Sequence, residues 1–290
     1  MSVAFAINIS CVISCLSYAT AILGQLLGGY GSGVLYVFSA ATALFGSNPI
    51  VTLLGPRKSL LVGMGFYCVY VSGFLLAVIS HNKFPLLGWI SFLTGSMFGG
   101  IASGIVWTAQ GRYFSLNAQQ YAAEVSEFGI RSQKVTNRFA GLFACIFLGT
   151  ECFLRAFASV FFLALPSAAT YDVVFAIYGT MTVLSFFLMT RVDDMGDMGT
   201  DKIEADVFLK ESTSALALVF ADVRLLLVIP FQLCVGLAFS FVPFYVFGKI
   251  IADSDELGSA YVGLISATIP LTGSAMAFPT ATIANKYGKP

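Results

Sequence analysis

Two opposite charges stand inside an apolar stretch of this chain, and they are the residues best placed to do chemistry. Glu151 and Arg155 lie in the segment Gly149-Thr-Glu-Cys-Phe-Leu-Arg-Ala156, near the centre of a predicted membrane-spanning helix. A spacing of four residues places both side chains on one helix face, so the carboxylate and the guanidinium can pair. Because one isolated charge costs about 2.5–3.5 kcal/mol at the bilayer centre, we expect the pair to face the protein interior.

Three roles stay open for this pair: a structural ion pair, a contact for a substrate or ion, and proton coupling through Glu151. An intramembrane enzyme is not expected, because the chain shows neither a nucleophile beside a base nor a metal-ligand spacing. No cofactor or metal is expected either. The glycines of Gly95–Gly104 lie inside a predicted span and not in a phosphate-binding loop, and the six cysteines form no CxxC pair.

The surroundings of the pair are unusually apolar. Of the 290 residues, 58% are hydrophobic and only 10% are charged, with a mean hydropathy of +0.87, whereas soluble domains average about 25% charged residues. This composition predicts an all-α integral membrane protein with the lipid bilayer as its environment. The balance of 15 basic and 15 acidic residues excludes a nucleic-acid partner, which would require a basic stripe.

The gaps between charges predict eight spans, since a span needs about 20 apolar residues. Met1 to Pro56 contains no charge and has room for two helices, separated by a glycine turn at Leu27-Gly-Gly-Tyr-Gly-Ser-Gly33. The expected spans are 3–26, 33–54, 59–80, 85–110, 138–164, 172–190, 225–248 and 258–282. The small residues of Gly95–Gly104 predict close helix packing within the bundle, with dimerisation as the alternative.

These spans predict three parts: a six-helix lobe at 1–190, a polar cytosolic linker at 191–224, and an incomplete second lobe of two helices at 225–290. The loops carry 12 basic residues on one side of the membrane and two on the other. By the positive-inside rule, the N-terminus and the linker are expected in the cytosol. The membrane itself can be the plasma membrane or an endomembrane.

A short loop motif occurs once in each lobe. Its residues are Gly55, Arg57 and Lys58 after the second span, and Asn285, Lys286 and Gly288 after the eighth. Both copies are glycine turns with basic residues at a cytosolic helix end, and they resemble the loop motif of the major facilitator superfamily, which is built from six-helix repeats. The acidic position of that motif is Thr52 in the first copy and Asn285 in the second.

A second pattern resembles one branch of that superfamily. A Trp-x-x-Gln-Gly-x-Tyr run ends the fourth span, and an Asn-x-Phe-x-Gly-x-Phe run opens the fifth, as in the Unc-ninety-three-like, ion-channel regulatory branch. The residues are Trp107, Gln110, Gly111 and Tyr113, then Asn137, Phe139, Gly141 and Phe143. The resemblance implies a twelve-helix, two-lobed protein, so a chain that ends at Pro290 is expected to be truncated after its eighth helix.

These two runs have two interpretations. Trp107 and Tyr113 suit the membrane boundary, and Gln110 and Asn137 can satisfy backbone groups at helix ends. The runs can therefore form a structural clamp between the fourth and fifth helices. The alternative is direct contact with a substrate.

The resemblance implies two functions. The first is transmembrane transport of a small solute, and the alternative is a non-transporting regulator or chaperone of a channel, mainly a potassium channel, or of a membrane receptor. Polar residues of the first span that face the lobe centre, such as Asn8, Ser14 and Gln25, would favour a solute path. An apolar and filled lobe interior would favour the partner interpretation.

Overall fold

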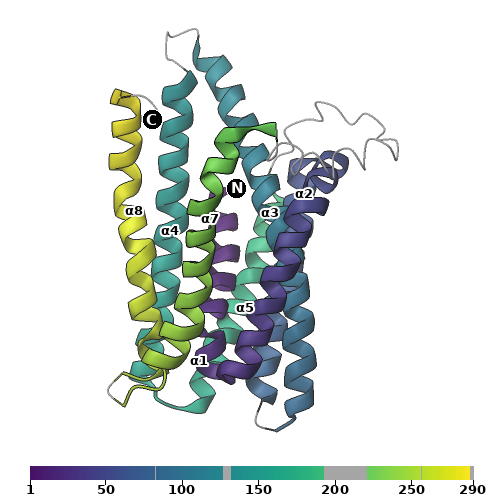
Figure 1. Ribbon diagram of the computed structural model, residues 1–290, viewed down its shortest axis with the longest axis vertical. Coiled ribbons are helices and arrows are strands. Elements are labelled where there is room, and N and C mark those ends of the chain that lie inside the picture. The colour runs from purple at the N-terminus through teal and green to yellow at the C-terminus, as the bar shows by residue number, and fades with distance from the viewer. Residues whose placement is uncertain (82, 127–131, 193–220, 256, 288–290) are drawn as a thin grey trace.

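The computed structural model describes residues 1–81, 83–126, 132–192, 221–255 and 257–287. These residues form a bundle of long helices without strands, as Figure 1 shows. Six helices are long and apolar enough to cross a membrane. The prediction of an all-α membrane protein is therefore confirmed.

The elements follow one another along the chain in a fixed order. They are α1 (Ser2–Ala41), the π-helix η1 (Thr42–Gly46), α2 (Ser47–Ser80), α3 (Pro85–Ser126), α4 (Ser132–Ala164), α5 (Ala168–Thr190), α7 (Val223–Phe241), the π-helix η2 (Val242–Ile251), the 3-10 helix η3 (Ser259–Tyr261) and α8 (Val262–Tyr287).

The apolar run from Ser2 to Ser80 is folded back on itself twice. Gly24 and Gly55 have φ values of 79° and 76°, in the left-handed region that glycine adopts without steric cost. The hydroxyl of Ser59 donates to the carbonyl of Ile50 at 3.4 Å, although nine residues of a straight helix span about 13.5 Å. The run, which counts as one of the six long apolar helices, therefore supplies three spans. With the five other helices, the described residues contain eight spans.

The first of these turns corrects the sequence prediction. We expected it at Leu27–Gly33, but the chain reverses at Gly24. A Cβ atom on Gly28 would lie 2.5 Å from the carbonyl oxygen of Ala19, on the preceding arm. The glycine cluster thus allows the two arms to pack closely after the turn, and it does not form the turn itself.

Two helices are longer than the hydropathy pattern predicts. Helix α3 continues from the expected end at residue 110 to Ser126, and α4 begins at Ser132 instead of 138. The added stretch of α3 contains good helix formers and no proline. Hydropathy marks only the apolar part of a helix, whereas these segments extend α3 and α4 beyond that part at the upper end of Figure 1.

Aromatic side chains fill the interior of the first lobe. Phe74 packs edge-on against Phe175 and Phe92, with ring centroids 4.8 and 5.6 Å apart. Tyr18 lies edge-on against Phe175 at 6.0 Å. All four rings are fully buried and come from α1, α2, α3 and α5, so this core holds the first lobe together.

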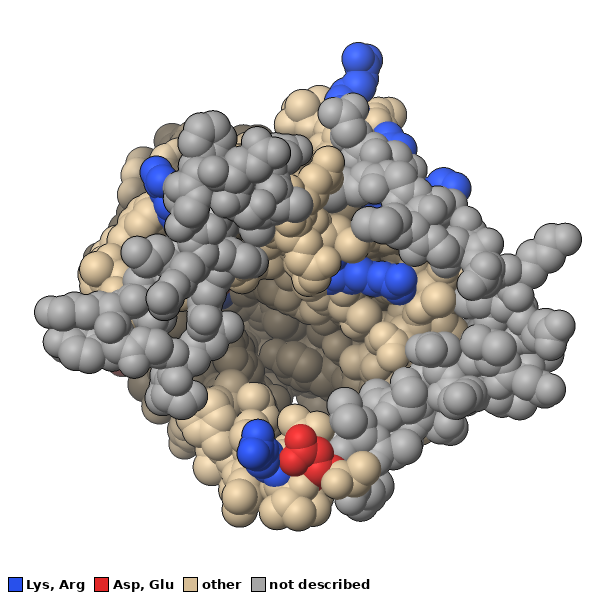
Figure 2. Space-filling model, turned by 90° about the horizontal axis from the view of Figure 1, so that it is seen from above, with Lys and Arg blue, Asp and Glu red and all other residues tan. Residues whose placement is uncertain are grey.

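The segments of the second lobe pack against the first lobe at two places. Helix α8 packs along α4, and η2 packs on α1. Helix α7 has almost no buried surface, since every residue from Val223 to Phe241 is exposed except half-buried Val235. Figure 2 shows that the upper face of the molecule is hollowed at its centre.

The start of α7 and the end of α8 lie toward one end of the bundle, the upper end in Figure 1. Met1 lines the same cavity as Tyr113 near the end of α3 and Val192 after α5. Residues 193–220, which make up most of the predicted linker, lie outside the described part of the chain. The assignment of this end to the cytosol stays a prediction, as do the domain limits 1–190, 191–224 and 225–290.

Close packing at the α3 glycines predicts a position-specific effect of one methyl group. A Cβ on Gly104 would lie 2.8 Å from the backbone nitrogen of Ala43, whereas nothing lies within 4 Å of a Cβ on Gly179. We expect Gly104→Ala to lower the melting temperature in detergent, because overpacking costs about 1–3 kcal/mol. Gly179→Ala should leave it unchanged or raise it. Equal effects of the two substitutions would contradict the packing assignment.

Candidate functional site

The structure places Glu151 and Arg155 together inside the bundle. The Nη2 atom of Arg155 lies 2.5 Å from Oε1 of Glu151 on the same face of α4. Each side chain is only 8% exposed. The spacing of four residues therefore has the result that we expected, a paired and inward-facing charge couple.

The pair also contacts the second lobe. Arg155 Nη1 donates a hydrogen bond of 3.1 Å to the backbone carbonyl of Ser266 in α8. One turn along α4, the hydroxyl of Ser159 accepts the backbone N–H of Leu264 at 2.9 Å. We call these five residues, Glu151, Arg155, Ser159, Leu264 and Ser266, the α4–α8 clasp.

Tyrosines of the first lobe surround the clasp. The hydroxyl of Tyr18 in α1 shares a hydrogen bond of 3.0 Å with Ser159. Tyr178 of α5 donates to the carbonyl of Leu154 at 2.5 Å. Gly263 allows this approach, because a Cβ there would lie 2.6 Å from the Ser159 hydroxyl. Four helices thus meet at one buried polar cluster.

The charged groups of the clasp are already hydrogen-bonded within the protein, which limits the chemistry that they can do. The guanidinium already donates to a carboxylate and to a carbonyl, and only Arg155 Nε is buried without a partner. Within the described parts of the chain, no three His, Cys, Asp or Glu side chains gather as a metal site requires. The clasp therefore has the properties of a structural junction: breaking a buried ion pair by removing one partner costs about 3–5 kcal/mol.

The first family run lies on α3 beside the start of α1. Trp107 is 43% exposed and packs edge-on against Phe5 and Phe147, at 5.6 and 5.8 Å. Tyr113 is buried. Gln110 is half-buried, and Gly111 is exposed with open space around it.

The second family run lies on α4, where its aromatic rings contact rings of α1 and α3. Phe143 contacts Phe5 at 5.4 Å, and Phe139 contacts Tyr121 of α3 at 5.1 Å. Asn137 is buried beside them. Gly141 is the exception, because a Cβ there would lie 3.2 Å from Ala281 of α8.

Phe5 is the residue that sequence reasoning missed at this junction. Its ring lies within 6.1 Å of Trp107, Phe143 and Phe147 and is fully buried. No local signal could have singled it out, because it is one of 28 phenylalanines in an apolar segment. Nearby, Tyr113, Phe139 and Phe143 border a cavity of about 320 Å³ at the upper end of the bundle.

The first copy of the loop motif forms a hydrogen-bonded turn. Gly55 supplies the left-handed backbone, and Arg57 Nη2 donates to the carbonyl of Thr190 at 2.8 Å, at the end of α5. Arg112 Nη1 donates to the hydroxyl of Thr52 at 3.3 Å. A hydroxyl thus accepts at the position where the superfamily motif has a carboxylate, and Lys58 is exposed.

The structure says less about the second copy. Asn285 and Lys286 belong to α8, but their side chains are among those left undescribed, and Gly288 lies outside the described residues. Their likeness to Gly55, Arg57 and Lys58 stays a prediction.

Buried polar residues line the inner face of α1. Asn8 Nδ2 donates to the carbonyl of Thr182 at 3.2 Å and to the hydroxyl of Ser185 at 3.0 Å. Asn8 Oδ1 and the hydroxyls of Ser10 and Ser14 are buried without a partner. Of the three polar residues whose position bears on a solute path, Asn8 and Ser14 are buried, whereas Gln25 is exposed beyond the Gly24 turn.

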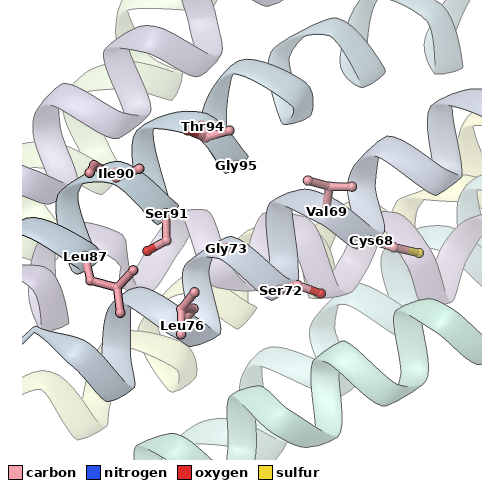
Figure 3. Close-up of a pocket in the computed structure, with 10 residues that line it drawn as sticks. All are labelled: Cys68, Val69, Ser72, Gly73, Leu76, Leu87, Ile90, Ser91, Thr94 and Gly95. Carbon is pink, nitrogen blue, oxygen red and sulfur yellow. The ribbon is translucent and has the colours of Figure 1, made fainter.

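A groove that the sequence did not suggest opens between α2 and α3. Its volume is about 530 Å³, and Figure 3 shows its two walls, Cys68–Leu76 and Leu87–Gly95. A Cβ on Gly73 would lie 2.7 Å from the carbonyl oxygen of Ser91. Its lining is apolar apart from small hydroxyls and one thiol, which suits contact with lipid chains.

Comparison with known proteins identifies the family. The sequence model described as "Ion channel regulatory protein UNC-93" matches residues 23–283. The chain belongs to the UNC-93 family. This confirms the resemblance inferred from the Trp107–Tyr113 and Asn137–Phe143 runs.

A curated relative supports the same family. UNC93-like protein 3 from Arabidopsis thaliana is 25% identical over 229 residues, which cover 74% of this chain and 45% of the relative. The chain therefore spans less than half the length of that relative. No solved structure matches the chain.

The pairing in the clasp predicts how charge removal will act. Glu151→Gln should sharply lower the yield of folded protein, because it leaves Arg155 buried without its counter-charge. Adding Arg155→Gln should recover part of that yield. Fluorescence-detected size-exclusion chromatography of both variants measures the difference. A double variant as damaged as the single one would show that charge pairing is not the reason.

The aromatic junction of the family runs predicts a second stability effect. Phe5→Ala should destabilise the protein by about 3–5 kcal/mol, the usual cost of removing a buried ring. Phe153, which is 65% exposed, provides the matched control, and Phe153→Ala should cost far less. Thermal unfolding in detergent compares the two. Similar losses would mean that Phe5 does not hold the junction together.

Proposed function

We propose that this protein is a membrane-embedded regulator that associates with an ion channel and alters its current or its abundance in the membrane. The proposal draws its partner class from the family, whose description names ion channel regulation. It draws its main structural support from one observation, the engagement of Glu151 and Arg155 with each other and with Ser266.

A transporter needs binding groups that a solute can reach from each side in turn. The intramembrane charges are the strongest candidates for such groups by residue type. Here the carboxylate and the guanidinium are each 8% exposed and already hydrogen-bonded. A solute would have to break the α4–α8 clasp to reach them.

The interior of the first lobe supports the same proposal. Tyr18, Phe74, Phe92 and Phe175 occupy its centre and are fully buried. A filled aromatic core gives a rigid scaffold that can present its outer surface to another membrane protein. This is the apolar, filled interior that favours the partner interpretation over a solute path.

Solute transport is the second candidate, and one observation favours it. Asn8 Oδ1 and the hydroxyls of Ser10 and Ser14 are buried on α1 without partners. Buried polar atoms without partners are unusual, and they are of the kind that a polar solute could bind.

Co-expression tests the proposal. The chain is expressed in oocytes with each member of a panel of potassium-selective channels, and current and surface channel number are recorded. For at least one channel we expect a change of about fivefold or more, the lower range of typical coupling between sites.

Flux measurements in proteoliposomes separate the two candidates. We expect solute uptake no greater than in protein-free vesicles. Uptake above that level, lost on Ser14→Ala, together with channels that do not respond, would overturn the regulator proposal and favour transport.

A further inference from the structure

The second lobe contains prolines within its helical segments, and two of them free a carbonyl group at a contact with the first lobe. Proline has no N–H, so the carbonyl four residues before it loses its usual helical partner. For Pro243 that carbonyl belongs to Phe239, and for Pro270 it belongs to Ser266.

First-lobe side chains donate to both of these carbonyls. The hydroxyl of Tyr36 in α1 donates to the Phe239 carbonyl at 3.1 Å. The guanidinium of Arg155 in α4 donates to the Ser266 carbonyl, also at 3.1 Å. The two donors come from different helices and have different chemistry, yet each reaches a carbonyl in its neighbour that a proline leaves open.

We infer that Tyr36 and Arg155 cap proline-freed carbonyls and that these two caps attach the second lobe to the first at the points where its helices can bend. The bilayer supplies no alternative partner for a free carbonyl. Each cap therefore holds a bend in place, and removing it leaves the bend unsupported. Because an ionised donor makes the stronger bond, the Arg155 cap is the firmer one.

The Gly24 turn strengthens the cap at Pro243. Thr20, on the arm before the turn, donates to the carbonyl of Pro243 itself at 2.7 Å, while Tyr36 on the arm after the turn reaches Phe239. The two arms of α1 therefore hold both sides of the proline. The π-helix η2 begins at Val242, as expected where a missing N–H disturbs the regular hydrogen-bond pattern.

Glu151 has a definite part in this arrangement. It binds Arg155 Nη2 from within the same helix, which leaves Nη1 pointing at α8. Glu151 thus acts as a positioning residue for the Arg155 cap.

The test is a double-mutant cycle that restores the missing N–H. Tyr36→Phe removes only the hydroxyl and should lower the melting temperature in detergent by about 2–4 °C. In a Pro243→Ala background, residue 243 can donate to the Phe239 carbonyl itself. The same Tyr36→Phe change should then have no effect.

Tyr178→Phe is the matched control. Tyr178 also donates to a backbone carbonyl, that of Leu154, but residue 158 is an alanine with its own N–H. Its removal should therefore cost the same in both backgrounds. A Tyr36→Phe loss that persists in the Pro243→Ala background would overturn the inference and make Tyr36 an ordinary packing contact.

A cross-link in native membranes tests the Arg155 cap without purification and so tolerates unstable variants. A Cβ on Gly141 would lie 3.2 Å from Cβ of Ala281. This distance is close to the Cβ–Cβ distance of a disulfide, which is about 3.5–4.5 Å. The reporter is therefore Gly141→Cys with Ala281→Cys, in a Cys145→Ala background because Cys145 is one turn away. The variant with Ala281→Cys alone, which lacks the cysteine at position 141, is the negative control.

Every Arg155→Gln variant also carries Glu151→Gln, so that no charge is left unpaired, and it is compared with the reporter in which Glu151 and Arg155 are both intact. Arg155→Gln should reduce the cross-linked fraction severalfold, and adding Pro270→Ala should restore it, because residue 270 then donates to the Ser266 carbonyl. An equal reduction with and without Pro270→Ala would overturn the inference for this cap. So would an unchanged cross-linked fraction in Arg155→Gln.

Discussion

The lipid bilayer offers no hydrogen-bond partners, and the arrangement of this protein depends on how the chain satisfies its polar groups without them. Glu151 and Arg155 satisfy each other within one helix and place one remaining guanidinium donor against α8. The same demand explains why backbone carbonyls at the end of α5 and before Pro243 receive side-chain donors from other helices. Polar contacts therefore help to specify how the helices of this bundle are matched.

The two parts of the molecule meet this demand differently. The first lobe has an aromatic core that contains the buried rings of Tyr18, Phe74 and Phe175. The segments of the second lobe are held at α4 and at the folded α1, while α7 remains exposed over nearly its whole length. A rigid lobe joined to a less supported one is compatible with the proposed association with an ion channel.

The family runs that identify the branch are mainly packing elements in this structure. Trp107, Phe139 and Phe143 take part in ring contacts that join α3 to α4 and to Phe5 of α1. Gly141 instead admits α8. At the loop motif, Arg112 donates to Thr52, so a neutral hydroxyl accepts this bond where the superfamily pattern has a carboxylate.

The sequence alone determined the features that depend on neighbouring residues. Hydropathy predicted the membrane class and the eight spans. A spacing of four residues predicted the Glu151–Arg155 pair. The turn between the second and third spans lies at Gly55, as expected. Tertiary structure decided which glycine turns the chain, since Gly24 and the Gly28–Gly33 cluster are equally able to turn, and only the contact with Ala19 distinguishes them. It also decided the partners Ser266, Phe5 and Ala281, because these contacts join residues that are far apart in the chain and leave no periodic signal in it.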